Sequence, residues 1–536
     1  MAASRIPEPS GHAAPIDTDY EIGQHNIEMQ LGPFGLDIHN PVFVVSGLTV
    51  IAFVLLALAL QEQAEAFFVW LRGFLTSGFD WFFLLSANIF VVLGLVLVVS
   101  PLGRVRIGGT EATPDYSYLS WFAMLFAAGM GIGLMFFGVA EPISHYSSSL
   151  AENAGTPESW APLAGAAGDP EGARRLAMAA TIFHWALHPW AIYALVALAL
   201  ALFAYNKGLP LTMRSIFYPV FGERTWGWPG HIVDILAVFA TLFGLATSLG
   251  IGAQQANAGL EFLFGIPVND LSKVILVIGI TAIAVTSVVK GLDAGVKRLS
   301  EINMVLAALL LLFVLVFGPT LALITGFFGN LAAYAQYLPA LSNPFGRSDA
   351  NFAQGWTAFY WAWWISWSPF VGMFIARVSR GRTVREFIVS VLLIPSLVSV
   401  VWMTVFGSTA ISLVAGGVQA IADAALELKL FTMLEQLPLA GLTSFVGILL
   451  VIVFFTTSSD SGSLVIDTIT AGGKVDAPLA QRVFWAVFEG LVAIALLLGG
   501  GLVALQAAAV STGLPFTLVL LLGCYTLIRG LLSEPR

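Results

Sequence analysis

Two clusters of aromatic side chains stand out inside apolar stretches of this 536-residue chain. Five of its 15 tryptophans fall in the segment WTAFYWAWWISWSPF at 356–370, and a second cluster lies in HWALHPWAIY at 184–193. The faces of indole and phenol rings attract a cation without hydrogen-bonding to it, and cages of such rings bind quaternary ammonium groups. The clusters contain no Asp or Glu, which would suit a primary amine better. They therefore favour a permanently charged, methylated head group.

Not every residue in these clusters is expected to contribute to a cage. Tryptophan is also enriched at membrane interfaces, and that position is expected for Trp356 and Trp361. His184 and His188 have the spacing of metal ligands, but no third ligand is nearby, so packed or pore-lining histidines are the favoured interpretation. Pro189 lacks a backbone N–H and therefore frees a carbonyl near the middle of its helix.

A glycine-rich segment, AAGMGIGLMFFGVAEP at 127–142, interrupts another apolar stretch. Gly129, Gly131 and Gly133 weaken a helix and leave backbone groups free. Irregular backbone at membrane depth is tolerated where it lines a cavity, and broken helices of transporters bind ions and substrates in this way. Close helix packing through Gly129 and Gly133 explains the same spacing equally well.

Hydroxyl groups gather in VFFTTSSDSGS at 453–463. Sodium is a hard cation that prefers oxygen ligands, so hydroxyls together with freed carbonyls would suit it. The alternative is that each hydroxyl bonds back to the carbonyl four residues earlier. Acids within apolar segments are functional candidates by default, but a position near the membrane interface is favoured for most of them. These acids are Glu141, Asp460, Asp467 and Glu489.

The composition indicates the class of protein to which these segments belong. Hydrophobic residues make up 58% of the chain and charged residues only 10%, against roughly 25% charged residues in soluble domains. This balance predicts a protein that resides in a lipid bilayer, and no binding of nucleic acid is expected. Long apolar runs indicate helices rather than a barrel, so the expected class is an all-α integral membrane protein. Twelve spans are expected, near 40–61, 81–101, 118–140, 176–204, 232–260, 271–290, 302–327, 355–376, 386–412, 441–466, 483–500 and 503–528.

An even number of spans places both termini on one side of the membrane. Lys and Arg divide 17 to 6 between alternate loops, and the set with 17 includes both termini, so both are expected in the cytoplasm. The acidic segment before the first span is expected to be disordered.

Taken together, the glycine segment, HWALHPWAIY and YWAWWISWSPFVGMFIARVSRGRTVREF resemble the betaine/choline/carnitine transporters over roughly residues 40–530. The resemblance implies a LeuT-like fold in which spans 3–7 and 8–12 form two inverted repeats of five helices, preceded by two extra helices. It also implies a bacterial inner-membrane carrier that works by alternating access and often forms homotrimers. The expected segments are 1–39 (tail), 40–117 (accessory helices), 118–328 (first repeat), 329–351 (external connection), 352–530 (second repeat) and 531–536 (tail).

The resemblance also assigns residues to two sites. An aromatic box with an unwound glycine stretch would bind the substrate through Trp185, Trp190, Tyr193, Trp363, Trp364, Trp367, Gly129, Met130 and Gly131. A sodium ion would bind at Ala127, Met130, Phe454, Thr457 and Ser458. A second sodium site is incomplete, because Thr241 and Phe370 match the family pattern but Leu245 replaces its second threonine.

The function expected from the sequence is therefore sodium-coupled import of a methylated onium solute, and no enzymatic activity is expected. Glycine betaine or dimethylsulfoniopropionate is favoured over choline, because proton-driven choline carriers tend to have Asp where Gly133 stands. The alternative is a sodium-independent or proton-coupled choline or carnitine transporter or exchanger of the same family.

Overall fold

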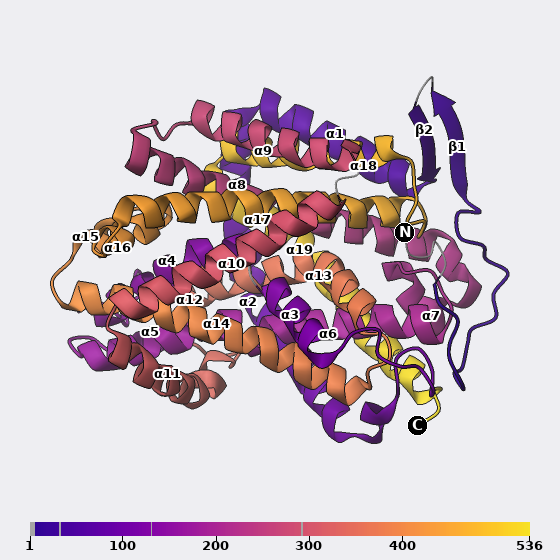
Figure 1. Cartoon of the computed structure of the whole chain (residues 1–536), viewed down its shortest axis with the longest axis horizontal. Coiled ribbons are helices and arrows are strands. Elements are labelled where there is room, and N and C mark those ends of the chain that lie inside the picture. Colours follow the sequence, from indigo (N-terminus) through magenta and orange to yellow (C-terminus); the bar gives the residue numbers. More distant parts are fainter. Residues whose placement is uncertain (1–5, 32–33, 130, 291–292) are drawn as a thin grey trace.

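The computed structural model describes residues 6–31, 34–129, 131–290 and 293–536 and is almost entirely helical (Figure 1). The predicted all-α integral membrane class is confirmed. The first part of the helical chain comprises α1 (Val42–Ala59), α2 (Gln61–Val99), α3 (Tyr118–Gly129), α4 (Ile132–Leu150), α5 (Pro170–Trp185), α6 (Leu187–Ala201), α7 (Tyr218–Phe221), α8 (Trp228–Phe264), α9 (Asp270–Lys290), α10 (Asp293–Phe317) and α11 (Thr320–Leu341). The second part comprises α12 (Ala350–Phe352), α13 (Ala358–Val378), α14 (Val384–Ala415), α15 (Ala420–Asp423), α16 (Lys429–Glu435), α17 (Ala440–Thr470), α18 (Leu479–Leu498) and α19 (Gly501–Leu532).

The helices of spanning length follow the predicted order. In the described part of the chain, ten helices or continuous helix pairs are long and apolar enough to cross a membrane, and the bent pair α3 and α4 makes an eleventh. Helix α13 falls at the predicted eighth span, is rich in tryptophan, and is mostly buried between other helices. With α13 included, five helical units lie from α3 to α10 and five from α13 to α19, and their division into two inverted repeats stays a prediction.

Two of the spans are broken where the sequence indicated a break. Helices α3 and α4 meet at an angle of 61°, and Gly131, with φ −177° and ψ −175°, is extended rather than helical. Helix α5 ends at Trp185, and α6 begins after Ala186, whose φ and ψ are both −109°. Pro189 cannot donate to the carbonyl of Trp185, so the helix restarts with this proline in its first turn, where no N–H is needed.

Helix α13 contains a proline but stays continuous. Pro369 removes the hydrogen bond that would reach the carbonyl of Ile365. The hydroxyl of Ser368 donates to that carbonyl instead, at 2.7 Å, and so satisfies it. The aromatic residues of α13 therefore lie along one uninterrupted helix.

Both termini lie at the same end of the helical bundle (Figure 1). Lys207 Nζ donates to the carbonyl of Ala14 in the amino-terminal segment, at 3.0 Å, and forms an ion pair with Glu534 near the other terminus. Arg380, from a loop predicted to share this side, donates to Ser10 Oγ at 3.3 Å. The basic loops and the two termini therefore meet at one end, as the even number of spans predicts.

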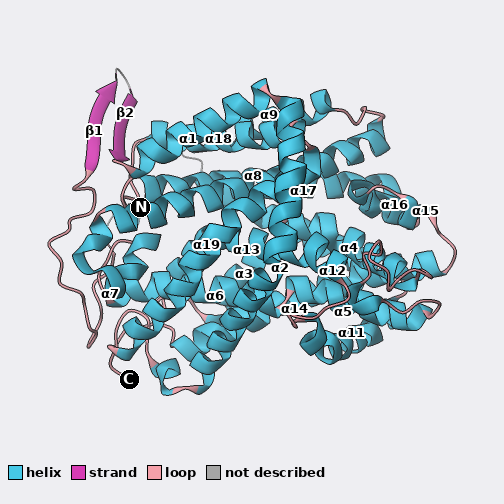
Figure 2. Ribbon diagram, turned by 180° about the vertical axis from the view of Figure 1, so that it is seen from behind, coloured by secondary structure: helices cyan, strands magenta, loops and turns pink. Residues whose placement is uncertain are grey.

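The acidic amino-terminal segment is ordered in the described structure, whereas disorder was expected. Strands β1 (Asn26–Leu31) and β2 (Phe34–His39) pair antiparallel and project beside the bundle (Figure 2). Lys474 forms an ion pair with Asp37 at 2.5 Å, and Asn26 donates to the carbonyl of Ala471 at 2.8 Å. The hairpin is thus held by polar contacts to the loop that follows α17.

Two further segments differ from their expected boundaries. The predicted seventh span ran to residue 327, but α10 ends at Phe317 and α11 begins at Thr320, because Gly318 and Pro319 interrupt the helix. Helix α11 therefore occupies most of the expected external connection. In the segment 414–440, the side chains of Leu430, Phe431 and Leu434 on α16 are buried, so this short amphipathic helix packs against the bundle.

Candidate substrate and cation site

A cavity of about 360 Å³ lies where the broken helices meet α13 and α17. All six residues of the predicted aromatic box line it, together with Gly131, Ala127, Phe454, Thr457 and Ser458 from the other predicted positions. Phe370 lines it as well, whereas Met130 lies outside the described residues. The structure therefore brings the two predicted sites into one chamber.

Three tryptophans of the box are fixed by hydrogen bonds from their indole N–H groups. Trp363 Nε1 donates to Ser248 Oγ at 3.2 Å, and Trp364 Nε1 donates to the carbonyl of His184 at 2.9 Å. Trp367 Nε1 donates to the carbonyl of Gly244 at 2.9 Å. Because each indole N–H is already bonded to the protein, the apolar ring faces are left for a ligand.

The rings surround the cavity from three helices, α5, α6 and α13. Trp185, at the end of α5, lies edge-on to Trp364 with centroids 4.9 Å apart, and Trp363 stacks on Trp364 at 4.8 Å. On α6, Trp190 and Tyr193 meet at 5.2 Å and 70°. Trp185 thus lies just before the break between α5 and α6, and Trp190 and Tyr193 lie after it. Such an arrangement presents several π faces to one guest, as cation–π recognition requires.

Gly133 makes room for the box on α4. A Cβ atom at this position would lie 2.6 Å from Cη2 of Trp185 and 3.3 Å from Cη2 of Trp363. The first distance is shorter than real Cβ contacts, so any side chain would displace the Trp185 ring. The structure thus supports a packing role for the third glycine of the segment.

The described sodium-ligand candidates line the same cavity from two helices, α3 next to the break in the third span and α17. Ala127 is in the last turn of α3, where carbonyls lack partners from a further helical turn. Thr457 and Ser458 lie on α17, half-buried, next to Phe454. The hydroxyl of Thr457 also bonds back to the carbonyls of Val453 and Phe454, both at 3.1 Å, which is the alternative interpretation of its position. The geometry is compatible with either role.

The two residues that match the incomplete second sodium site lie in different surroundings. Thr241 on α8 is fully buried, and its hydroxyl has no hydrogen-bond partner among the described residues. It is not among the described residues that line the cavity, although Phe370 is. Leu245, one turn along, packs so closely on Gly462 that a Cβ there would lie 2.3 Å from its Cδ1. An apolar contact therefore occupies the place of the second threonine.

Glu141 and Trp361, for which a position near the membrane interface was expected, lie in the protein interior rather than on its surface. Both are fully buried in the bundle, and Trp361 stacks on His188 with centroids 5.3 Å apart. His188 itself bonds to Asn88, so it packs as expected and shares no ligand position with His184.

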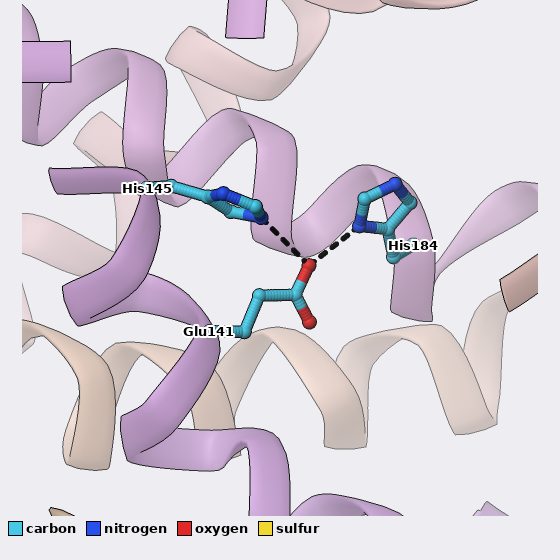
Figure 3. Close-up of side chains that lie close together, drawn as sticks. All are labelled: Glu141, His145 and His184. Atoms are coloured by element: carbon cyan, nitrogen blue, oxygen red, sulfur yellow. Dashed lines mark hydrogen bonds and ion pairs between the residues drawn. The ribbon is translucent and has the colours of Figure 1, made fainter. Parts of the chain in front are cut away.

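Sequence reasoning missed a polar cluster directly behind the box. His184 Nδ1 lies 2.5 Å and His145 Nε2 3.1 Å from Oε1 of Glu141 (Figure 3). The other oxygen, Oε2, accepts from Trp185 Nε1 at 2.7 Å and from the hydroxyl of Tyr360 at 2.6 Å. The ligand-type atoms of these two histidines and the glutamate lie within 4.8 Å of one another, so the residue types also suit a metal ion. The one available signal was Glu141 four residues before His145 on the same helix face.

Comparison with known proteins agrees with this geometry. The family described as betaine/carnitine/choline family transporter matches residues 41–536. The chain is 67% identical to a glycine betaine/proline/choline transporter of Vibrio parahaemolyticus, over 99% of this chain and 97% of that one. It is 54% identical to glycine betaine transporter 1 of the same organism, over 96% and 97% of the two chains. It is 45% identical to the glycine betaine transporter of Acinetobacter baylyi, over 92% and 73%. This protein is therefore a multi-pass membrane transporter, not an enzyme, and belongs to the betaine/carnitine/choline transporter family.

Proposed function

We propose that this protein imports a methylated onium solute, with glycine betaine or dimethylsulfoniopropionate as its main substrate, by sodium symport. The observation that carries the proposal is the convergence of six aromatic rings with the hydroxyls of Thr457 and Ser458 on one cavity. The rings suit a methylated cation, and the hydroxyls with the last carbonyls of α3 suit sodium. The names of the relatives given above support glycine betaine within this class.

The charges around the cavity favour a zwitterion over a simple cation. Among the described residues that line the cavity, Arg377 is the one with a charged side chain. It lies in the last turn of α13. A carboxylate on the substrate would be attracted to this guanidinium, whereas choline carries no such group.

Transport by alternating access would place the described structure in a state that faces the end with both termini. The cavity lining extends along α13 from Trp363 in the box to Arg377 in the last turn. The loop after α13 contacts the amino-terminal segment through Arg380 and Ser10. With the termini in the cytoplasm of a bacterial cell, as the charge distribution of the loops favours, this is an inward-facing arrangement in the inner membrane.

Coupling would arise because the sodium ion and the substrate both contact the broken third span. An ion held between the end of α3 and Thr457 on α17 would fix the broken third span, and Gly131 and Gly133 on that span border the box. Occupancy of one site would thereby favour the conformation that binds at the other. One sodium ion per cycle is proposed because the residue types at the predicted site around Thr457 all suit sodium, whereas the site at Thr241 lacks its second threonine. Assembly as a homotrimer is proposed from the family resemblance alone.

The test is uptake of radiolabelled glycine betaine into proteoliposomes, with and without an inward sodium gradient. Choline, carnitine, proline and dimethylsulfoniopropionate are added as competitors. Accumulation that requires sodium, with glycine betaine or dimethylsulfoniopropionate as the strongest competitor, is the expected result. Sodium-independent exchange, or accumulation driven by a proton gradient, would show that the hydroxyls on α17 only pack and that the coupling proposed here is wrong.

A further inference from the structure

Glu141 connects four side chains from three helices at the rear of the aromatic box. It is fully buried in α4 and accepts from His145 on its own helix, from His184 and Trp185 at the end of α5, and from Tyr360 on α13. Of these partners, Trp185 is a wall of the cavity, whereas the other three lie behind it. Among the described residues that line the cavity, Trp185 is thus the one that bonds directly to the carboxyl group, while Tyr360 contacts the box through its ring, which stacks on Trp364 at 5.8 Å.

The hydrogen bonds around Glu141 are those of an ionised carboxylate. Four groups that can donate surround its two oxygens, and a carboxylate is an acceptor only. Thr357 Oγ1 lies 2.9 Å from Nε2 of His184 and can donate to it, so a neutral imidazole can donate from Nδ1. His145 Nδ1 has no partner among the described residues, which also allows a neutral ring that donates from Nε2. The cluster can thus keep one net negative charge.

We propose that Glu141 is the buried counter-charge and positioning residue of the aromatic box, and that it acts on the substrate through the indole of Trp185. A carboxylate that accepts the N–H of an indole pushes electron density into the ring and makes its face more attractive to a cation. The same bond fixes the plane of Trp185 against Gly133 and Trp364. This proposal rests on the proposed function, since it assigns a role in binding the onium group.

This arrangement explains how a cage with no acidic side chain on its surface can bind a cation. A carboxylate inside the cavity would attract water and cations of any kind, because charges are strongly solvated. Glu141 lies at the N–H edge of Trp185 and outside the cavity lining, so its charge acts through the ring, and the methyl groups of an onium head still meet an apolar ring face. The box can therefore select a methylated cation over sodium or a primary amine while still opposing its charge.

The decisive experiment is a double-mutant cycle on binding. Equilibrium binding of radiolabelled glycine betaine to purified full-length protein is measured at saturating sodium for wild type, Glu141→Gln, Trp185→Phe and the double variant. Phenylalanine keeps a ring at position 185 but has no N–H for Glu141 to polarise. Glu141→Gln is expected to raise the Kd about tenfold in the wild-type background and less than about twofold in the Trp185→Phe background.

An analogue without the cationic nitrogen separates the cation–π interaction from packing. 3,3-Dimethylbutyrate has the shape of glycine betaine with carbon in place of the charged nitrogen, and its affinity is measured by competition. Glu141→Gln is expected to leave this affinity within about twofold of wild type, because no cation is present to feel the ring. Equal weakening of both ligands, or the same loss in both backgrounds, would overturn the proposal and leave Glu141 with a packing role.

Two controls keep the result interpretable. Tyr360→Phe removes a donor from the same carboxylate oxygen but keeps the indole bond, so its Kd is expected to change less than about threefold. Glu141→Asp, which keeps the charge, is expected to recover part of the affinity lost in Glu141→Gln. If chelator treatment of the wild type reproduces the loss, the cluster is a metal site and the proposal is wrong. If the wild type binds no onium compound, it is the proposed function that fails.

Discussion

The indole N–H of Trp367 on α13 donates to the backbone carbonyl of Gly244 on α8, 2.9 Å away. A Cβ at Gly244 would lie 3.0 Å from Cδ1 of that ring, so the glycine allows the indole to lie against the α8 backbone. The bond and the contact fix the plane of a ring that lines the cavity. Helices from the two halves of the chain are thus joined at the proposed binding site.

Removing one ring of the box should weaken substrate binding without abolishing transport. Trp367→Ala and Trp190→Ala are each expected to raise the KM for glycine betaine by roughly 2- to 30-fold, since a cation–π contact contributes about 0.5–2 kcal/mol. Phenylalanine at either position should restore part of the loss. Trp70→Ala, at an exposed position on α2, serves as the control. Near-normal KM in both alanine variants would contradict the cage.

Adding one methyl group to the broken span should disturb the box. Gly133→Ala places a Cβ 2.6 Å from the Trp185 ring, so the ring or the helix must shift and the KM for glycine betaine should rise at least several-fold. Gly279→Ala on α9 is the matched control, because a Cβ there meets nothing within 4 Å among the described residues. Uptake kinetics in proteoliposomes compare the two. Equal behaviour of both variants would show that the close approach of Trp185 to α4 is not required.

Neighbouring threonines on α17 provide a test of the sodium site. Both Thr456 and Thr457 bond back to the carbonyl four residues earlier, at 2.9 and 3.1 Å, but of the two only Thr457 lines the cavity. Thr457→Val is expected to raise the sodium concentration for half-maximal uptake about tenfold or more, because it removes an oxygen ligand from a cation. Thr456→Val should leave this concentration unchanged. The same shift in both variants would assign the hydroxyl of Thr457 to packing.

Breaking a buried ion pair near the termini should destabilise the protein more than breaking an exposed ion pair. Arg214 Nε lies 3.1 Å from Oδ2 of Asp234, and both side chains are fully buried. Asp234→Asn leaves the guanidinium without its counter-charge, which costs about 3–5 kcal/mol. Glu171→Gln breaks the exposed pair with Arg174 and should cost about 1 kcal/mol at most. Heat-induced unfolding in detergent should therefore shift clearly to lower temperature only in Asp234→Asn.

Much of the site could be predicted because its signals are local. The break at Ala186 follows from Pro189, and the rings of α13 lie within twelve consecutive residues, so composition and spacing already indicate a cage. The sequence signal for the end of α10 was equally local, since Gly318 and Pro319 interrupt the helix. The continuous apolar character of the segment outweighed that signal.

The cluster around Glu141 could not be predicted in the same way. Its hydrogen bond to Tyr360 joins residues 219 positions apart, and the one to Trp185 joins residues 44 apart. A single acid in an apolar segment carries no information about such partners. Only the packing of α4 against α5 and α13 shows that the carboxylate is fully bonded inside the bundle.

Attachment of the amino-terminal hairpin should weaken in acid because of His39. This side chain is fully buried, its Nε2 lies 3.1 Å from Nη1 of Arg214, and the guanidinium is the donor, so His39 accepts in its neutral form. Burial, followed by the charge of Arg214 and by His231 and His25, lowers the pKa of His39 to about 2. In the detached hairpin the pKa returns to about 6.5. The neutral form required for docking is therefore fully available above pH 6.5, and docking weakens as the pH falls below it, by up to about tenfold per unit.

The rate of cleavage by a glutamyl endopeptidase at Glu21 and Glu28 measures this attachment, after normalisation to a free peptide of the same sequence at each pH. Cleavage is expected to accelerate between pH 7 and pH 5 in the wild type. His39→Asn keeps an acceptor for Arg214 but cannot be protonated, so its cleavage should vary little with pH. His12→Asn, in the exposed part of the same segment, should behave as wild type. A His39→Asn variant that retains the wild-type pH dependence would show that other groups release the hairpin.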